Sequence, residues 1–107
     1  MAEPALNVIF GARATQDSTT LTITKADLTG LTPSATNTAE SLLAAIVAFA
    51  QPTLSTANQA QNIDQSIVIS DSNDNIVTRS GVAYRRKSKI IAFDRVDNGS
   101  TFNPNDY

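Results

Sequence analysis

The chain has 107 residues, of which 41% are hydrophobic, and a formal net charge of -2. This length fits a single domain, residues 1–107, and the apolar fraction suffices for a folded core. Histidine and cysteine are both absent, which removes the commonest transition-metal ligands and every catalytic device built on an imidazole or a thiol. We therefore expect no enzyme activity, no cofactor and no metal site.

The N-terminal third predicts two strands. After a short polar arm at about residues 1–5, the apolar run Leu6–Phe10 predicts the first strand. Residues 12–20 are small and polar and predict a connection. Residues 19–25 alternate threonine with apolar side chains, which is typical of a half-buried strand. Residues 27–34 contain glycine and proline and predict a loop.

A helix that begins near Asn37 and ends before Pro52 is the clearest element. Asn37 and Glu40 have the spacing of a capping box, and a proline stops a helix. Glu40 is the only charged residue between Leu28 and Ile63, and such depletion of charge is typical of interface centres. A plain neutral surface is an equal alternative. As interface residues on this helix we predict one apolar stripe, formed by Leu42, Ile46 and Phe49.

The polar stretch after the helix leaves two interpretations open. Residues 53–64 either extend the helix beyond a kink or form a loop. Residues 65–70 then alternate apolar and polar side chains and predict a strand. Asp71–Asn75 imitates the first half of a calcium loop, but Ile76 stands where such a loop needs glycine. We therefore interpret this segment as a polar hairpin turn.

The last third predicts a hairpin, a final strand and a tail. Residues 76–79 and 82–86 flank Ser80-Gly81 and predict the hairpin, and residues 89–96 predict the strand. The tail at about residues 98–107 predicts an arm without regular structure. Together the elements predict an α+β fold: a small antiparallel sheet in the order β-β-α-β-β-β, with one main helix packed on it.

The main cluster of charge contains Arg85, Arg86 and Lys87. It is either a strand edge guarded by charge against pairing, or a patch that docks on an acidic partner. A third interpretation is a ribbon that contacts phosphates while Tyr84 stacks on a base. We favour the first two, because the rest of the chain is acidic. A small nucleic-acid-binding module is the alternative function.

Three segments carry a resemblance: Ala2–Gly11, Leu21–Leu28, and Val77–Arg79 together with Tyr84–Arg86. Here the chain resembles small uncharacterised proteins of cyanobacteria and their phages. The resemblance implies a virion structural role, such as capsid decoration or a tail component, and it carries over no functional residues.

We therefore expect a non-enzymatic structural subunit of a larger assembly, which contacts copies of itself or virion proteins. The expected location is the virion or the cytoplasm. The N-terminus lacks the pattern of a secretory signal, and the longest apolar run, Leu42–Ala50, is shorter than a membrane span.

Overall fold

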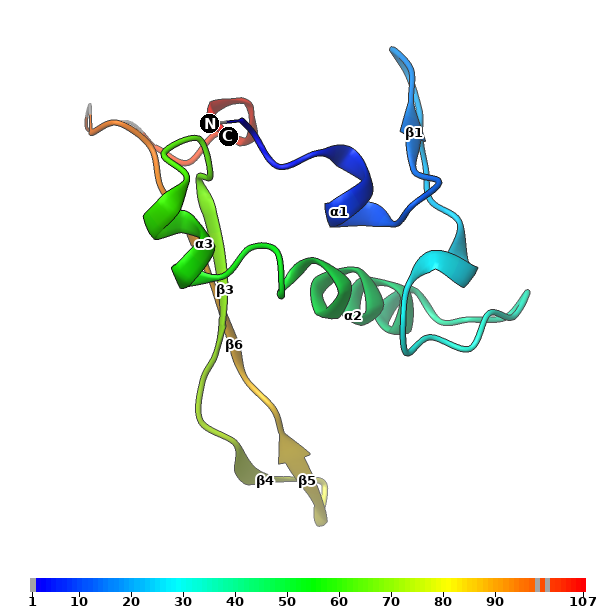
Figure 1. Ribbon diagram of the computed structural model, residues 1–107. Helices are drawn as coiled ribbons and strands as arrows, with labels where there is room; N and C mark the ends of the chain where they lie inside the picture. Colours follow the sequence, from blue (N-terminus) through cyan, green and yellow to red (C-terminus); the bar gives the residue numbers. More distant parts are fainter. Residues whose placement is uncertain (1, 98, 100) are drawn as a thin grey trace.

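The computed structural model describes residues 2–97, 99 and 101–107, and Figure 1 shows helices beside a long two-stranded ribbon. The α+β fold class is confirmed, with α2 as the main helix. The elements in chain order are α1 (Leu6–Phe10), β1 (Thr15–Gln16), β2 (Leu21–Thr22), η1 (Lys25–Asp27), α2 (Ala39–Ala50), α3 (Thr56–Gln61), β3 (Ile67–Asp71), β4 (Asn75–Arg79), β5 (Val82–Arg86), β6 (Lys89–Phe93) and η2 (Pro104–Asp106).

Antiparallel pairing is divided among two-stranded sheets. β1 pairs with β2, β3 with β6, and β4 with β5. The β3–β6 ladder runs from Ile67 opposite Phe93 to Asp71 opposite Lys89. The β4–β5 ladder continues beyond it, and the N–H of Ser72 donates to the carbonyl of Ser88 between the two. The two ladders form one ribbon, residues 67–93, which we call the β-arm.

The predicted hairpin at Ser80-Gly81 is confirmed. Both residues have positive φ, 49° and 76°, and this geometry suits the twist of a two-residue β-hairpin. The predicted strands at residues 65–70 and 89–96 are confirmed as β3 and β6.

The prediction that Asp71–Asn75 is a hairpin turn is wrong. β3 pairs with β6 rather than with β4, so this segment joins two ladders along one side of the β-arm. Residues 72–74 lie opposite residues 87–88, so one strand carries one extra residue, as in a β-bulge. The polar residues 72–74 interrupt the pairing between the two ladders. The chain reverses its direction only at Ser80-Gly81, where the backbone has positive φ.

The predicted strand at Leu6–Phe10 is also wrong, because this segment is helix α1. Five apolar residues suit a strand or a buried helical turn equally well by pattern alone. The helix is favoured by packing: α1 contacts α2, and Ile9 packs against the core. Of the strand predicted at residues 19–25, only Leu21–Thr22 is β-structure, and a 3₁₀ turn follows at Lys25.

The N-cap of helix α2 lies one residue later in the chain than predicted. The side chain of Thr38 accepts from the N–H of Ser41 at 3.0 Å, so Thr38 is the N-cap. Asn37 instead accepts from the N–H of Ser34 in the preceding turn. The predicted stop is confirmed, since α2 ends at Ala50. The open question at residues 53–64 is decided by α3, which Ser55 caps.

The core is small. Ala50, Leu54 and Ile69 form its centre, and Val47, Ile9 and Ile67 pack around them. The carbonyl of Leu54 also accepts from the N–H of Ile69 at 2.9 Å, which joins the α2–α3 connection to the β-arm. The helices therefore hold only the first part of the β-arm.

The C-terminal segment folds back on the β-arm. The rings of Phe102 and Tyr107 lie 5.0 and 5.5 Å from that of Phe93, and Arg95 pairs with Asp106. Among the described residues, the predicted arm thus has its own packing and one 3₁₀ turn. Positions 98 and 100 of the predicted C-terminal arm, and position 1 of the predicted N-terminal arm, lie outside the described residues.

The turn between β1 and β2 predicts a local pH effect. The carboxylate of Asp17 accepts from the N–H groups of Thr19 and Thr20, and these bonds lower the pKa of Asp17 to about 2. The pKa is depressed by folding, so this stabilisation is present above the unfolded value of about 3.9 and is lost as pH falls through about 2. NMR shifts of the two threonine amides should titrate with a midpoint near 2. Asp17→Asn should abolish that titration, and a midpoint of about 4 would contradict the turn geometry.

Candidate interaction surface

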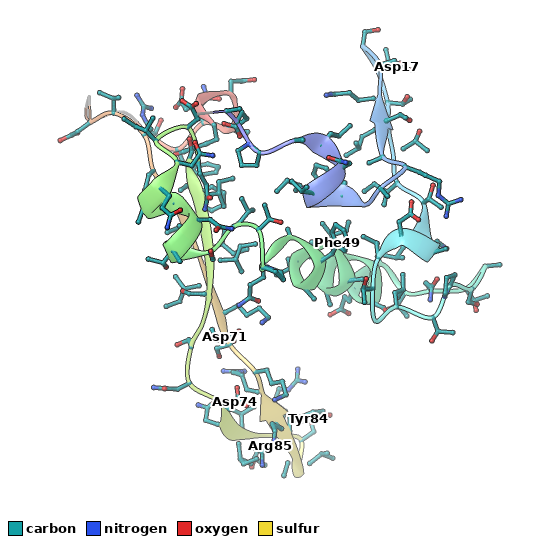
Figure 2. All side chains as sticks on the ribbon, viewed as in Figure 1. Asp17, Phe49, Asp71, Asp74, Tyr84 and Arg85 are labelled. Carbon is teal, nitrogen blue, oxygen red and sulfur yellow. The ribbon has the colours of Figure 1, made fainter. Side chains whose placement is uncertain are left out.

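The β-arm becomes more exposed toward its hairpin turn. Val68 and Ile69 on β3 are buried beside the helices, whereas every residue of β5 and β6 is exposed. Figure 2 shows Tyr84 and Arg85 at the far end of the β-arm, away from the helices. The large apolar side chains exposed along this ribbon include Ile76, Val82, Tyr84 and Ile90. Apolar side chains on an uncovered strand are typical of a surface that another chain covers.

The last part of the β-arm, residues 75–86, which we call the tip, has two different faces. Cross-strand partners lie on the same face of a ribbon. Val77 is paired with Tyr84, and Arg79 is paired with Val82. Asn75 with Arg86 completes this face, which therefore has an apolar centre and an arginine toward each end. The other face carries Ile76 beside Arg85.

The lysines and the arginines of the β-arm differ in their partners. Lys89 lies 2.6 Å from Asp71, which lowers the pKa of that carboxyl through a direct hydrogen bond, and Lys87 lies 3.0 Å from Asp74. Within the described part of the chain, the three arginines of the tip have no carboxylate partner. The cationic groups that remain available to another molecule are those of Arg79, Arg85 and Arg86.

The two groups of predicted interface residues lie in different parts of the molecule. Leu42, Ile46 and Phe49 are half-buried on α2. Arg85 and Arg86 are exposed on β5, and Lys87 follows them. The structure does not bring the two groups together, and the interface role of each stays a prediction.

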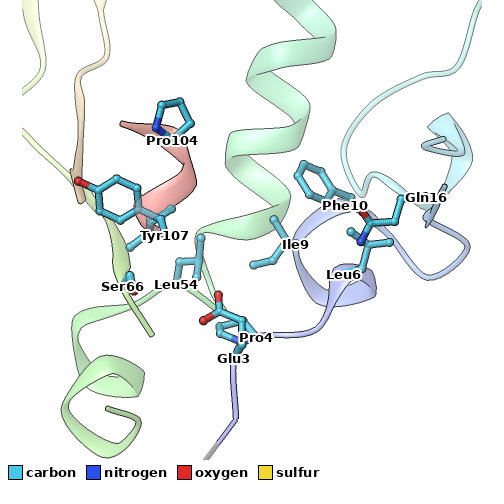
Figure 3. A pocket seen from close by; sticks show the side chains of 11 residues that line it. Glu3, Pro4, Leu6, Ile9, Phe10, Gln16, Leu54, Ser66, Pro104 and Tyr107 are labelled. Carbon is cyan, nitrogen blue, oxygen red and sulfur yellow. The ribbon is translucent and has the colours of Figure 1, made fainter. Parts of the chain in front are cut away.

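A pocket of about 400 Å³ lies at the opposite end of the β-arm from the tip (Figure 3). Its lining is largely apolar and comes from the N-terminal segment, α1, the α2–α3 connection, the start of β3 and the C-terminal turn. The side chains that line it include Pro4, Leu6, Ile9, Phe10, Leu54, Ile67 and Tyr107. The sequence does not reveal this site, because Leu6–Phe10 lines it as a helix and the apolar pattern of this segment predicts a strand.

The described residues contain no group of three or more acidic, His or Cys side chains placed to hold a metal ion. Asp71 and Asp74, the two aspartates of the calcium-like motif, each pair with a lysine. Within the same residues, every helix is too short or too polar to cross a membrane.

Comparison of the chain with models of protein families, with curated proteins and with solved structures found no match.

Proposed function

We propose that this chain is a non-enzymatic structural subunit of a larger protein assembly and that the β-arm is its main contact surface. The observation that carries the proposal is the excess of exposed surface. The accessible area is 7778 Å², whereas a compact monomer of 11.3 kDa exposes about 5,700 Å². The radius of gyration is 16.2 Å, against about 13 Å for a compact domain of this length.

The β-arm contributes to this exposed surface, and it is an element that is weak by itself. An isolated two-stranded ribbon is marginally stable in water, and its outer edges present unpaired N–H and C=O groups. Beyond the first residues of β3, the β-arm has almost no cover from its own chain. Contact with another chain would cover its exposed apolar residues and satisfy its backbone groups, which supports an assembled rather than a solitary state.

The kind of assembly that we propose is a phage particle, with the chain as a capsid decoration or tail component. The resemblance to small proteins of cyanobacteria and their phages supports this assignment. A ribbon that projects from a small body suits such a role, because it reaches neighbouring subunits without requiring a large core.

The proposal predicts self-association that depends on the apolar side chains of the β-arm. Val82→Thr with Ile90→Thr keeps β-branched residues on the strands but reduces the exposed apolar area. We expect the wild-type chain to form oligomers, and this double variant to raise their dissociation constant at least about tenfold. Sedimentation velocity over a concentration series measures both.

Leu43→Gln is the matched control, because Leu43 is 63% exposed but lies on α2. It should leave the dissociation constant unchanged. If Leu43→Gln raised the dissociation constant and the double variant did not, the contact surface would lie on α2 and not on the β-arm. A wild-type chain that stays monomeric, also when virion proteins are added, would contradict the proposed function.

The three unpaired arginines of the tip favour nucleic-acid binding as a second candidate function. Against it, the guanidinium of Arg79 lies 4.3 Å from the centre of the Tyr84 ring and covers a face on which a base would stack. Binding of a single-stranded oligonucleotide that falls steeply with salt, and that Arg85→Ala with Arg86→Ala abolishes, would favour this second function.

A further inference from the structure

We infer that the partner of the tip is a second copy of this chain, and that the tip of one copy docks on the apolar pocket at the base of the next. The inference rests on the proposed function and adds the partner and the geometry of contact. By the base we mean the end of the molecule that holds this pocket, whose lining includes Glu3, Ser66 and Tyr107 (Figure 3).

The two ends of the molecule have opposite charge. The tip with its adjoining residues carries four cations and one carboxylate, a net charge of +3, in Arg79, Arg85, Arg86, Lys87 and Asp74. The base carries four carboxylates and one cation, a net charge of -3, in Glu3, Asp64, Asp94, Asp106 and Arg95.

Contacts of the neighbouring segments place Glu3, Asp64 and Asp94 at the base. Glu3 lines the pocket itself. The side chain of Asn62 donates to the carbonyl of Ala2, which brings the loop with Asp64 beside the N-terminal segment. Asp94 follows β6, and its N–H donates to Ser66, another residue of the pocket.

The faces also match in character. One face of the tip presents the pair Val77 and Tyr84, with Arg79 beside Val82 toward the turn and Arg86 at the other end. The base presents a largely apolar pocket with the carboxylate of Glu3 in its lining. Aromatic and arginine side chains are the residues that most often anchor protein interfaces in such pockets.

A chain cannot dock its own tip on its own pocket. Ile67 lines the pocket and Ser80 lies in the hairpin turn, and the 13 residue steps between them span up to about 43 Å at about 3.3 Å for each extended residue. This length agrees with the longest extent of the molecule, 47 Å, and Figure 1 shows β3 running from the helices toward the turn between β4 and β5 at the far end of the ribbon. The tip that fills a pocket must therefore belong to another copy.

Symmetric pairing of two tips is disfavoured. Antiparallel pairing of β5 with a second β5 over its full length would place Arg85 and Arg86 opposite Ala83 and Val82 of the other copy, with the two Arg85 residues diagonal to each other. This pairing brings two basic tips together, and cations on an edge strand are a known protection against such pairing. Tip-to-base contact brings opposite charges together instead.

The excess of exposed surface of the whole chain is larger than the area that two contacts in each copy would bury. A standard interface buries about 800 Å² on each partner, so a copy that uses both its tip and its base buries about 1,600 Å². The excess of exposed surface, about 2,000 Å² over a compact monomer, covers this amount. Contacts of this heterologous kind continue from copy to copy and produce a closed ring or an open filament.

Charge reversal at each end tests the inference. The tip variant is Arg85→Glu with Arg86→Glu, and the base variant is Glu3→Lys with Asp64→Lys; all four positions are exposed. Each variant alone brings like charges together, so we expect each to raise the dissociation constant of self-association at least about tenfold. An equimolar mixture should restore assembly, because the acidic tip of one variant then meets the basic base of the other.

Glu40→Lys, on α2 and away from both ends, is the control and should assemble as the wild type does. A base variant that self-associates like the wild type, or a mixture that does not assemble, would overturn the inference and leave the proposed function standing. A wild-type chain that forms no oligomer by itself also overturns the inference, and the proposed function fails with it only if the chain binds no virion protein either. Recovery in the mixture also shows that both variants are folded.

Discussion

Leu54→Ala is expected to lower the free energy of unfolding by about 2–5 kcal/mol. Leu54 is buried in a core centre that has only two other fully buried residues, Ala50 and Ile69. So small a cluster has few neighbours that can move into the cavity, which places the expected cost in the upper part of this range. Urea denaturation at a protein concentration where the chain is monomeric measures the change.

Leu43→Ala is the control for the same chemical change. Leu43 is 63% exposed on α2, and surface truncations of this kind usually change stability by less than about 0.5 kcal/mol. Hydrogen exchange adds a second test, because the N–H of Ile69 donates to the carbonyl of Leu54. Faster exchange at Ile69 in Leu54→Ala would show that the β-arm is held to the body through this contact. Equal unfolding free energies of the two variants would show that this core does not form.

The sequence signals that succeeded are those with a strict local chemistry. Pro52 ends α2 because it cannot continue the hydrogen-bond ladder. Ser80-Gly81 closes the hairpin because a two-residue turn of this kind needs positive φ at both positions. The end of a helix and a two-residue turn each depend on only a few neighbouring residues. Both can therefore be predicted from the local sequence.

The predictions that failed depend on contacts between distant residues. Leu6–Phe10 is a helix because Ile9 packs against the core, and the largely apolar pattern of these five residues does not reveal that contact. Similarly, β3 is adjacent to β4 along the chain but pairs with β6. Partner choice in a sheet is set by long-range packing, which a polar segment between two strands does not encode.

The candidate site was predicted in part. The cations at residues 85–87 were visible as a cluster, and the structure places two of them on an exposed strand. The pocket was not visible, because its lining comes from segments as far apart as Pro4 and Tyr107. The alternative surface on α2 was predicted from depletion of charge, and its role as an interface stays a prediction.

Gly11→Ala is expected to destabilise the chain by about 1–3 kcal/mol through backbone strain, with a further steric cost. Gly11 has φ of +109°, a conformation that an L side chain rarely adopts, and an added Cβ would lie 2.9 Å from the Cβ of Asp27. Asp27 accepts from the N–H and the guanidinium of Arg13 at 2.9 to 3.2 Å. Because these bonds hold the pKa of Asp27 below its usual range, displacement of Asp27 should raise that pKa toward the ordinary value, which an NMR titration follows.

Gly30→Ala separates the two causes. Gly30 also has positive φ, +93°, but an added Cβ would meet nothing within 4 Å, so this variant measures backbone strain alone and should leave the pKa of Asp27 unchanged. Gly11 also ends α1, whose Leu6, Ile9 and Phe10 line the pocket at the base. If the tip of a second copy docks there, Gly11→Ala should weaken self-association even under conditions where the chain remains folded, and Gly30→Ala should not. Equal loss of association in both variants would mean that the pocket takes no part in the contact.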